Sequence, residues 1–296
     1  MNKTPLAMLA GLAGFAIFGL SFLFSKVALE VASPFVLLSV RFVTAFLVMT
    51  AGIFLFRVPM QFKGKPVHLL LLMGLIQPGI YFVCETYGIA MTTASFSGIM
   101  LGLAPVVGLV LGRIFLKEKA TKFQVLCAFL SIFGVALTPL GGELGFSPLG
   151  VALLAGAAFT AAAFNVVSRH IAPYFSPLER TYIMSALGSV IFTAIALVQN
   201  GSDLSAFWVP MTSGGFWVAV VYLAVVSSIG AFLLINFATG VLPISVMSVF
   251  SNFATVISVL AGILILGDDF NLRQIIGIVI ITVSVCGVTF QKSPKA

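Results

Sequence analysis

Glu85 is the residue whose type and position point most clearly to chemistry, because it is the only carboxylate well inside an apolar run. If that run crosses a membrane, a carboxylate at its centre costs about 2.5–3.5 kcal/mol on insertion scales, so the residue should face a cavity or a partner. Two interpretations stay open. In the functional one, Glu85 binds an amine or exchanges a proton. In the structural one, it lies near the outer end of its helix and is bonded to neighbouring hydroxyls.

The polar residues around Glu85 extend this candidate site along one helix. Gln77, Tyr81 and Glu85 recur every four residues and therefore lie on one helix face. Pro78 and Gly79 beside them should loosen the helix and open backbone groups to a cavity. A polar stripe on an otherwise apolar helix should point inward, either to a ligand or to interhelical hydrogen bonds.

Further polar candidates lie in three other apolar runs. Those of the run 243–266 are spaced by three, four and three residues, and so share one face: Ser245, Ser248, Asn252 and Thr255. Serine and threonine commonly serve helix packing in membranes, whereas an amide costs more to bury. Asn165 and Asn236 are single amides in apolar runs, for which ligand binding and packing are both open. The candidate substrate-binding residues are therefore Glu85, Tyr81, Gln77, Asn165, Asn236, Asn252 and Ser248.

The composition requires a lipid environment for the elements that carry these residues. The 296-residue chain is 60% hydrophobic and 8% charged, with a mean hydropathy of +1.21, whereas soluble domains are roughly 25% charged. Its net charge of +7 comes from residues at the ends of apolar runs, where they set topology, so no nucleic-acid partner is predicted. The three cysteines lie inside apolar runs without metal-ligand spacing, and we predict no cofactor or metal.

Ten apolar runs can be traced, and each is long enough for a helix. They cover residues 5–27, 34–56, 67–90, 94–116, 123–140, 148–169, 177–199, 214–238, 243–266 and 272–290. We read the first as an uncleaved helix rather than a signal peptide, because the next run follows at once. Several runs begin at Ser or Pro, residues that suit a helix N-terminus.

The basic residues are unevenly divided between the two ends of these runs. With ten spans and a cytoplasmic N-terminus, only Lys26 and Arg273 fall outside, Arg41 lies near the outer end of the second helix, and the rest of the 15 basic residues fall inside. The positive-inside rule expects this asymmetry. It predicts ten transmembrane helices with both termini cytoplasmic. We interpret Arg41 and Lys26 as residues that snorkel to the headgroups.

Internal repetition divides the chain into two halves. A shift of 143 places Ser33-Pro34 on Ser176-Pro177, and a shift of 150 places Gln124 on Gln274. Because five helices is an odd number, the halves should insert in opposite directions, as in many secondary transporters. The sequence therefore predicts an all-α integral membrane protein of two inverted five-helix repeats, residues 1–142 and 143–296.

Short motifs in both halves resemble the EamA-type repeats of the drug/metabolite transporter superfamily. The first half carries Phe18-Gly19-Leu20-Ser21, Arg41-Phe42, Ala104-Pro105 and Lys117-Glu118; the second has Thr255 where the proline would be and Gly267-Asp268 for Lys-Glu. The resemblance implies a central cavity lined mainly by helices 1, 3, 4, 6, 8 and 9, with helices 5 and 10 at the periphery. Relatives mostly export amino acids, related metabolites or toxic compounds.

The sequence thus predicts a multi-pass protein of a bacterial inner (plasma) membrane that exports small metabolites by alternating access, with protons as a candidate coupling ion. A facilitator or a channel is the alternative. An enzyme is not expected: both histidines lie at helix ends, no HExxH occurs, and no GxxxxGK[ST] loop would couple the chain to ATP. We expect a monomer or weak dimer in contact with membrane lipid.

Overall fold

The computed structural model describes residues 3–118, 121–137, 147–201, 205–267 and 272–290, all of whose regular elements are helical. The predicted boundary between the halves, at 142/143, lies outside these ranges. The elements are α1 (Thr4–Leu29), α2 (Pro34–Leu55), α3 (Val67–Gly74), η1 (Leu75–Ile80), α4 (Tyr81–Ala90), α5 (Ala94–Leu101), α6 (Ala104–Phe115), α7 (Lys122–Leu137), α8 (Pro148–Ile171), α9 (Pro177–Asn200), α10 (Ser205–Met211), α11 (Gly214–Val221), η2 (Tyr222–Ala231), α12 (Phe232–Val241), α13 (Ile244–Ala261), η3 (Gly262–Leu266) and α14 (Leu272–Phe290).

Every apolar run of the sequence forms a helix or a chain of consecutive helices. Within the described residues, seven helical spans are long and apolar enough to cross a membrane, and three shorter apolar helices accompany them. The protein is therefore a multi-pass membrane protein, while the count of ten spans stays a prediction. The expected Ser-Pro helix starts are confirmed, since Ser33 and Ser176 are extended N-cap residues before Pro34 and Pro177.

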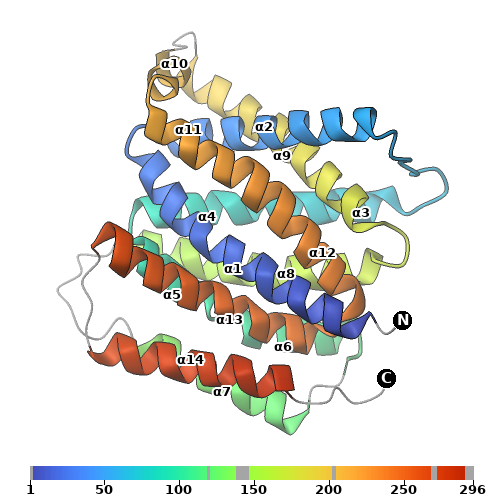
Figure 1. The fold of residues 1–296 in the computed structure, drawn as a ribbon, viewed down its shortest axis with the longest axis vertical. Helices are drawn as coiled ribbons and strands as arrows, with labels where there is room; N and C mark the ends of the chain where they lie inside the picture. The colour runs from blue at the N-terminus through green and yellow to red at the C-terminus, as the bar shows by residue number, and fades with distance from the viewer. Residues whose placement is uncertain (1–2, 119–120, 138–146, 202–204, 268–271, 291–296) are drawn as a thin grey trace.

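The helices lie side by side in one bundle, with the start of α1 and the end of α14 on the same side (Figure 1). At one end of the view α2 packs against α9, and at the other α7 packs against α14. Between these pairs, α1 packs against α12 and α13, while α8 packs against α4 and α6. The two peripheral pairs thus enclose a central group of helices that can hold a site.

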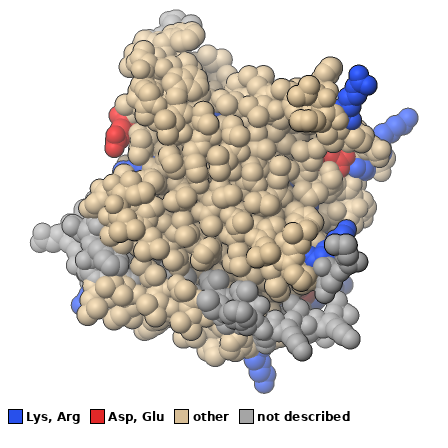
Figure 2. Space-filling view, in the orientation of Figure 1, with Lys and Arg blue, Asp and Glu red and all other residues tan. Residues whose placement is uncertain are grey.

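The outer surface of the bundle suits lipid. Figure 2 shows a face that is almost entirely uncharged, with lysine and arginine near its edges. Large apolar side chains are exposed there and elsewhere, including Phe54 at 85% and Val198 at 83% of their accessible surface. In water such a surface would be an aggregation hazard, whereas in a bilayer it is the expected outer face of membrane helices.

Several central helices are interrupted where they pass through the middle of the bundle. Gln77 in η1 has extended backbone angles (φ −143°, ψ 116°), and the following Pro78 has no N–H to donate. The helical run 214–241 contains the π-helical segment η2, and a turn at residues 102–103 separates α5 from α6. The loosening around Pro78 is therefore confirmed. Pro105 is the second residue of α6, which begins directly after the turn at 102–103, whereas η2 contains no proline.

Glycines let the central helices approach closely. A Cβ at Gly14 would lie 2.8 Å from Cγ1 of Ile235, and one at Gly98 would lie 2.5 Å from Oγ of Ser258. A Cβ at Gly19 would lie 2.5 Å from the backbone oxygen of Ala254. These glycines thus allow close packing between helices of this chain.

Two ion pairs each join the first predicted half to the second, on the side where the sequence collects basic residues. Lys65 Nζ lies 2.9 Å from Glu179 Oε1, and Arg169 Nε lies 3.5 Å from Glu118 Oε1. Glu118 also accepts the backbone N–H of Ile244, at 2.8 Å. Glu118 thus connects the residues after α6 to Arg169 in α8 and to the start of α13.

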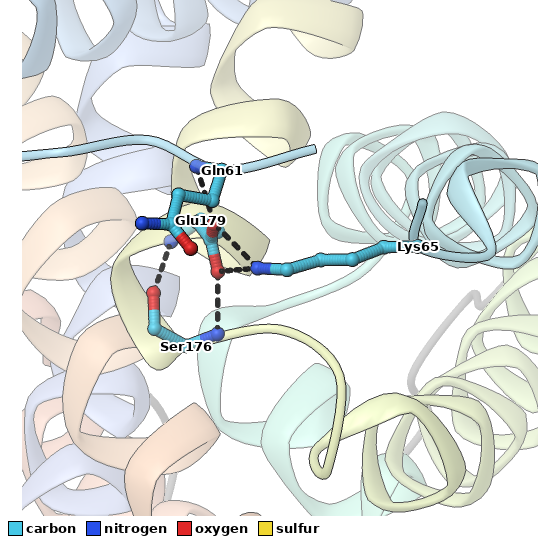
Figure 3. Close-up of polar contacts among 4 residues, drawn as sticks. All are labelled: Gln61, Lys65, Ser176 and Glu179. Atoms are coloured by element: carbon cyan, nitrogen blue, oxygen red, sulfur yellow. Dashed lines mark hydrogen bonds and ion pairs between the residues drawn. The ribbon is translucent and has the colours of Figure 1, made fainter. Parts of the chain in front are cut away.

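Glu179 is the centre of the first of these contacts (Figure 3). Its carboxylate accepts the backbone N–H of Gln61 at 2.9 Å and that of Ser176 at 2.8 Å, besides the bond from Lys65. Ser176 Oγ accepts the Glu179 N–H at 3.2 Å, which completes a capping box at the start of α9. One side chain thus fixes the 57–66 loop, the α8–α9 loop and the helix start.

We expect Glu179→Gln to lower the thermal stability of the purified protein by about 1–3 kcal/mol. An amide keeps only one acceptor oxygen, so its NH₂ group would face either the Lys65 ammonium or a backbone N–H. Lys65→Met leaves both backbone N–H bonds intact and should cost less. Equal losses of melting temperature for the two variants would show that the backbone contacts contribute nothing.

Candidate functional site

A narrow cavity lies among the central helices: its empty space, open solvent included, is about 540 Å³, and the centre of a water-sized sphere can occupy about 40 Å³ of it. Its lining comes from α1, η1, α4, α5, α6, α8, α12 and α13. These elements belong to the first, third, fourth, sixth, eighth and ninth of the ten apolar runs in the sequence. The family resemblance implies a cavity lined by the same six helices. The space therefore lies between the two predicted halves.

Aromatic rings make up much of the cavity wall: Phe15, Phe18, Phe22, Tyr81, Phe164 and Phe232. Phe18 connects several of them, with its ring centroid 5.8 Å from that of Phe232 and 6.1 Å from that of Tyr81. Edge-to-face and tilted pairs at these distances stabilise each other beyond the area they bury. The cavity is therefore a preformed apolar surface that suits a hydrocarbon or aromatic group.

Three polar side chains interrupt this wall: Gln77, Asn165 and Ser251. Asn165 is 6% exposed, and its Oδ1 has no hydrogen-bond partner among the described residues. A buried acceptor without a partner is costly, and a bound group with an N–H or O–H would satisfy it. No charged residue is among the lining residues. Pockets of this kind bind ligands by apolar contact and use a few polar groups for orientation.

Glu85 lies directly behind the cavity wall. Tyr81 lines the cavity, and its hydroxyl donates to Glu85 Oε1 at 3.1 Å. Glu85 is 1% exposed, and its Oε2 has no hydrogen-bond partner within the described part of the chain. The polar stripe predicted along this helix is thus brought together, with Gln77 and Tyr81 in the cavity wall and Glu85 one side chain deeper.

Arg41 approaches the same place from α2. It is 1% exposed, its Nε donates to Ser228 Oγ at 2.9 Å, and its Nη2 donates to Ser227 Oγ at 3.3 Å. The guanidinium carbon lies 4.4 Å from the centroid of the Phe82 ring, a cation–π contact. The interpretation of Arg41 as a snorkelling residue is therefore wrong, because the side chain turns inward to two serines.

A similar correction holds for Lys26. Its Nζ donates to the backbone oxygens of Ile89 at 3.2 Å and Thr92 at 2.7 Å. These carbonyl groups lie at the end of α4, where no further turn of helix can satisfy them. Lys26 therefore binds a helix C-terminus within the protein rather than headgroups.

Asn236 lies outside the cavity lining, in a cluster around Arg180. Its Nδ2 donates to Thr181 Oγ1 at 3.0 Å, and its Oδ1 accepts from Ser168 Oγ at 2.8 Å. Arg180, which is 1% exposed, donates to the Ser168 hydroxyl at 2.6 Å and to the Asn236 backbone oxygen at 2.6 Å. This network joins α8, α9 and α12, and its amide is fully used in packing.

Ser248 and Asn252 also lie outside the lining, on a face of α13 that packs against α5 and α6. Ser248 contacts Gly108, and Thr255 donates to the Gly98 backbone oxygen at 2.7 Å. Asn252 is fully buried, and neither its Oδ1 nor its Nδ2 has a partner among the described residues. Of this predicted face, the serine and threonine pack helices, while the role of the amide stays a prediction.

The described residues hold no group of three or more His, Cys, Asp or Glu side chains that could bind a metal. The aromatic cavity can instead offer apolar contacts to a small organic molecule, and the amides of Gln77 and Asn165 can orient it. The carboxylate of Glu85 and the guanidinium of Arg41 are buried nearby, outside the lining. Arg41 and its two serines are the part that sequence reasoning missed.

Comparisons with known proteins decide the family. The model of the EamA-like transporter family matches residues 5–139 and 148–290. The chain belongs to this family. It is 33% identical to the Bacillus subtilis transporter YcxC, over 99% of this chain and 96% of that protein, and 27% identical to YetK from the same organism, over 90% and 81%.

A solved crystal structure has the same fold as this family member. The two superpose with a TM-score of 0.76 at 19% sequence identity, and the match covers 96% of this chain and 98% of the other. The family and its relatives establish a membrane transporter.

Proposed function

We propose that the protein is a secondary transporter that exports small amphipathic metabolites, such as amino acids or related compounds, across a bacterial inner membrane. The observation that carries this proposal is the position of the cavity. It is lined by residues from both predicted halves, at the interruptions of the central helices, and the packing of α1 against α12 and α13 parallels that of α8 against α4 and α6. Transporters with inverted repeats bind substrate where the repeats meet.

In this proposal the chain crosses the membrane ten times as two inverted five-helix repeats, with both termini in the cytoplasm. The start of α1 and the end of α14 on one side of the bundle support an even number of spans (Figure 1). The packing of corresponding helices also supports the inverted relation. The second helix of one repeat packs against the second of the other (α2 and α9), and the fifth packs against the fifth (α7 and α14). Alternating access would then be a rocking of the two repeats around the cavity, in a monomer or weak dimer.

The lining defines the class of substrate in the proposal. The aromatic wall would bind the apolar part of the molecule, while Gln77 and the unpartnered Asn165 Oδ1 would bind its polar groups. Glu85 would exchange a proton as the substrate binds and leaves, because its free Oε2 lies one side chain behind the wall. Substrate and proton would then move in opposite directions.

Reconstitution into proteoliposomes tests this function. We expect a labelled amphipathic metabolite to show counterflow, that is, uphill uptake driven by unlabelled solute inside, because a carrier exposes one site alternately to both sides. A pH-sensitive dye inside the vesicles should report proton movement only when that solute is present.

Two other outcomes would assign a different mechanism. Counterflow without proton movement would make the protein a facilitator and would return Glu85 to a binding or structural role. Flux that never saturates and shows no counterflow would indicate a channel and would overturn the proposal, as would the absence of flux for every amphipathic metabolite tried.

A further inference from the structure

Two side chains of opposite charge, Arg41 and Glu85, are buried outside the cavity lining, and among the described residues one carboxylate oxygen has no partner. Arg41 and Glu85 interact electrostatically but make no ion pair, and each is 1% exposed. Glu85 keeps a free Oε2. Arg41 Nε and Nη2 donate to the hydroxyls of Ser228 and Ser227, and its guanidinium carbon lies 4.4 Å from the centroid of the Phe82 ring. Buried charges normally pair and complete their hydrogen bonds.

The surroundings of the two charges connect them to the cavity. Tyr81 lines the cavity and donates to Glu85, while Phe82 lies between Arg41 and the ring of Phe232, which also lines the cavity. The serines that hold Arg41 belong to η2, an irregular segment of a membrane helix. Such π-helical segments are frequent at functional sites. Tyr81 thus connects Glu85 to the cavity, and Phe82 and Phe232 connect Arg41 to it.

This arrangement has the chemistry to recognise a zwitterion. A guanidinium binds a carboxylate through its N–H donors, and a carboxylate with an unpartnered oxygen binds an ammonium group. One molecule that carries both groups on a short spacer would satisfy both side chains at once. A molecule with only one charge would leave the other buried charge unsatisfied, which is the basis of strong rejection in polar sites.

We propose that Arg41, held by Ser227 and Ser228, is a specificity-determining residue that binds the carboxylate of a zwitterionic substrate whose ammonium group is bound by Glu85. The apolar part of that substrate lies in the aromatic cavity. This assignment rests on the proposed transport function and narrows its substrate class to zwitterions. It also makes ammonium and proton alternative partners of Glu85 Oε2, as exchange requires.

Ligand-dependent thermal stabilisation of the purified full-length protein tests the assignment. The probes are the proteinogenic amino acids, and for each one that stabilises, its decarboxylated amine and its deaminated acid. We expect the intact amino acid to bind at least about tenfold more tightly than either counterpart. Arg41→Gln should lower the affinity for the amino acid to that of the amine, without changing the affinity for the amine itself.

Arg180→Gln is the matched control, since Arg180 is also a buried membrane arginine held by a serine. It should lower stability without altering the preference for the amino acid over its amine. If Arg41→Gln does not fold, Ser228→Ala removes the acceptor of Arg41 Nε and should reduce the same preference severalfold.

Three results would overturn the assignment: no amino acid stabilises the protein, the amine or acid binds as tightly as the amino acid, or both Arg41→Gln and Ser228→Ala leave the preference unchanged. These results differ from those that would overturn the proposed transport function. Saturable counterflow of a solute with one charge or none would keep the transporter and exclude the zwitterion site.

Discussion

Glu85→Gln is expected to abolish substrate-dependent proton movement in proteoliposomes. Glutamine has nearly the same shape and can still accept the bond from the Tyr81 hydroxyl through one oxygen, but it cannot take up or release a proton in the transport cycle. Counterflow of the solute is measured in the same vesicles, where the pH-sensitive dye should show no change. The exposed carboxylate of Glu30, at the end of α1, supplies a matched control, since Glu30→Gln should leave proton movement unchanged.

The same substitution should also reveal the link to Arg41. Removing one member of a buried charge pair leaves the other uncompensated, and we expect Glu85→Gln alone to cost roughly 3 kcal/mol of stability. Arg41→Gln in the same chain removes the remaining charge and should recover part of that loss. A double variant whose melting temperature falls by the sum of the single losses would show that the two charges do not interact. Proton movement that persists in Glu85→Gln would exclude Glu85 as the coupling group.

The helices of this protein could be predicted because their length and composition have one physical cause. A span must be apolar over about 20 residues, so each run shows its limits directly, and Ser33 and Ser176 mark two starts that the structure reproduces within a residue. The short helix Ser205–Met211 was not predicted, because it lies in a connection between runs where no membrane length applies.

The rotation of each helix could not be read in the same way. Asn165 and Asn236 are both single amides in apolar helices, yet the first lines the cavity and the second bonds to Ser168 and Thr181. Nothing in either local sequence distinguishes them, because the difference arises from the neighbouring helices. The sequence did predict the rotation of the helix that carries Gln77, Tyr81 and Glu85. Three polar residues on one face show which side of that helix points inward.

The inward position of Arg41 could have been predicted from its distance, in residues, from the start of its helix. Arg41 is seven residues from the start of α2, which at about 1.5 Å per residue places its Cα roughly 10 Å into the helix. A side chain at that depth reaches headgroups less easily than a polar partner inside the bundle. Ser227 and Ser228, adjacent hydroxyls in an otherwise apolar run, were the corresponding signal on the facing helix.

Gly19→Ala is expected to be among the most damaging single-methyl changes in the central helices. The new Cβ would lie 2.5 Å from the backbone oxygen of Ala254 and 2.9 Å from Cβ of Ile257, so no flexible side chain can move aside and α1 must shift away from α13. Overpacking of this kind costs about 1–3 kcal/mol. Because Ala254 also lines the cavity, the shift should weaken substrate binding as well as stability.

Gly52→Ala gives the comparison that isolates this effect. Gly52 is also helical, in α2, but nothing lies within 4 Å of its added Cβ, so the same methyl should be neutral or slightly stabilising through helix propensity. Thermal unfolding of the two variants in detergent, followed by counterflow in vesicles, measures both consequences. Equal stability of Gly19→Ala and Gly52→Ala would mean that α1 and α13 can separate freely. The close α1–α13 contact would then constrain neither the cavity nor the movement of the two halves.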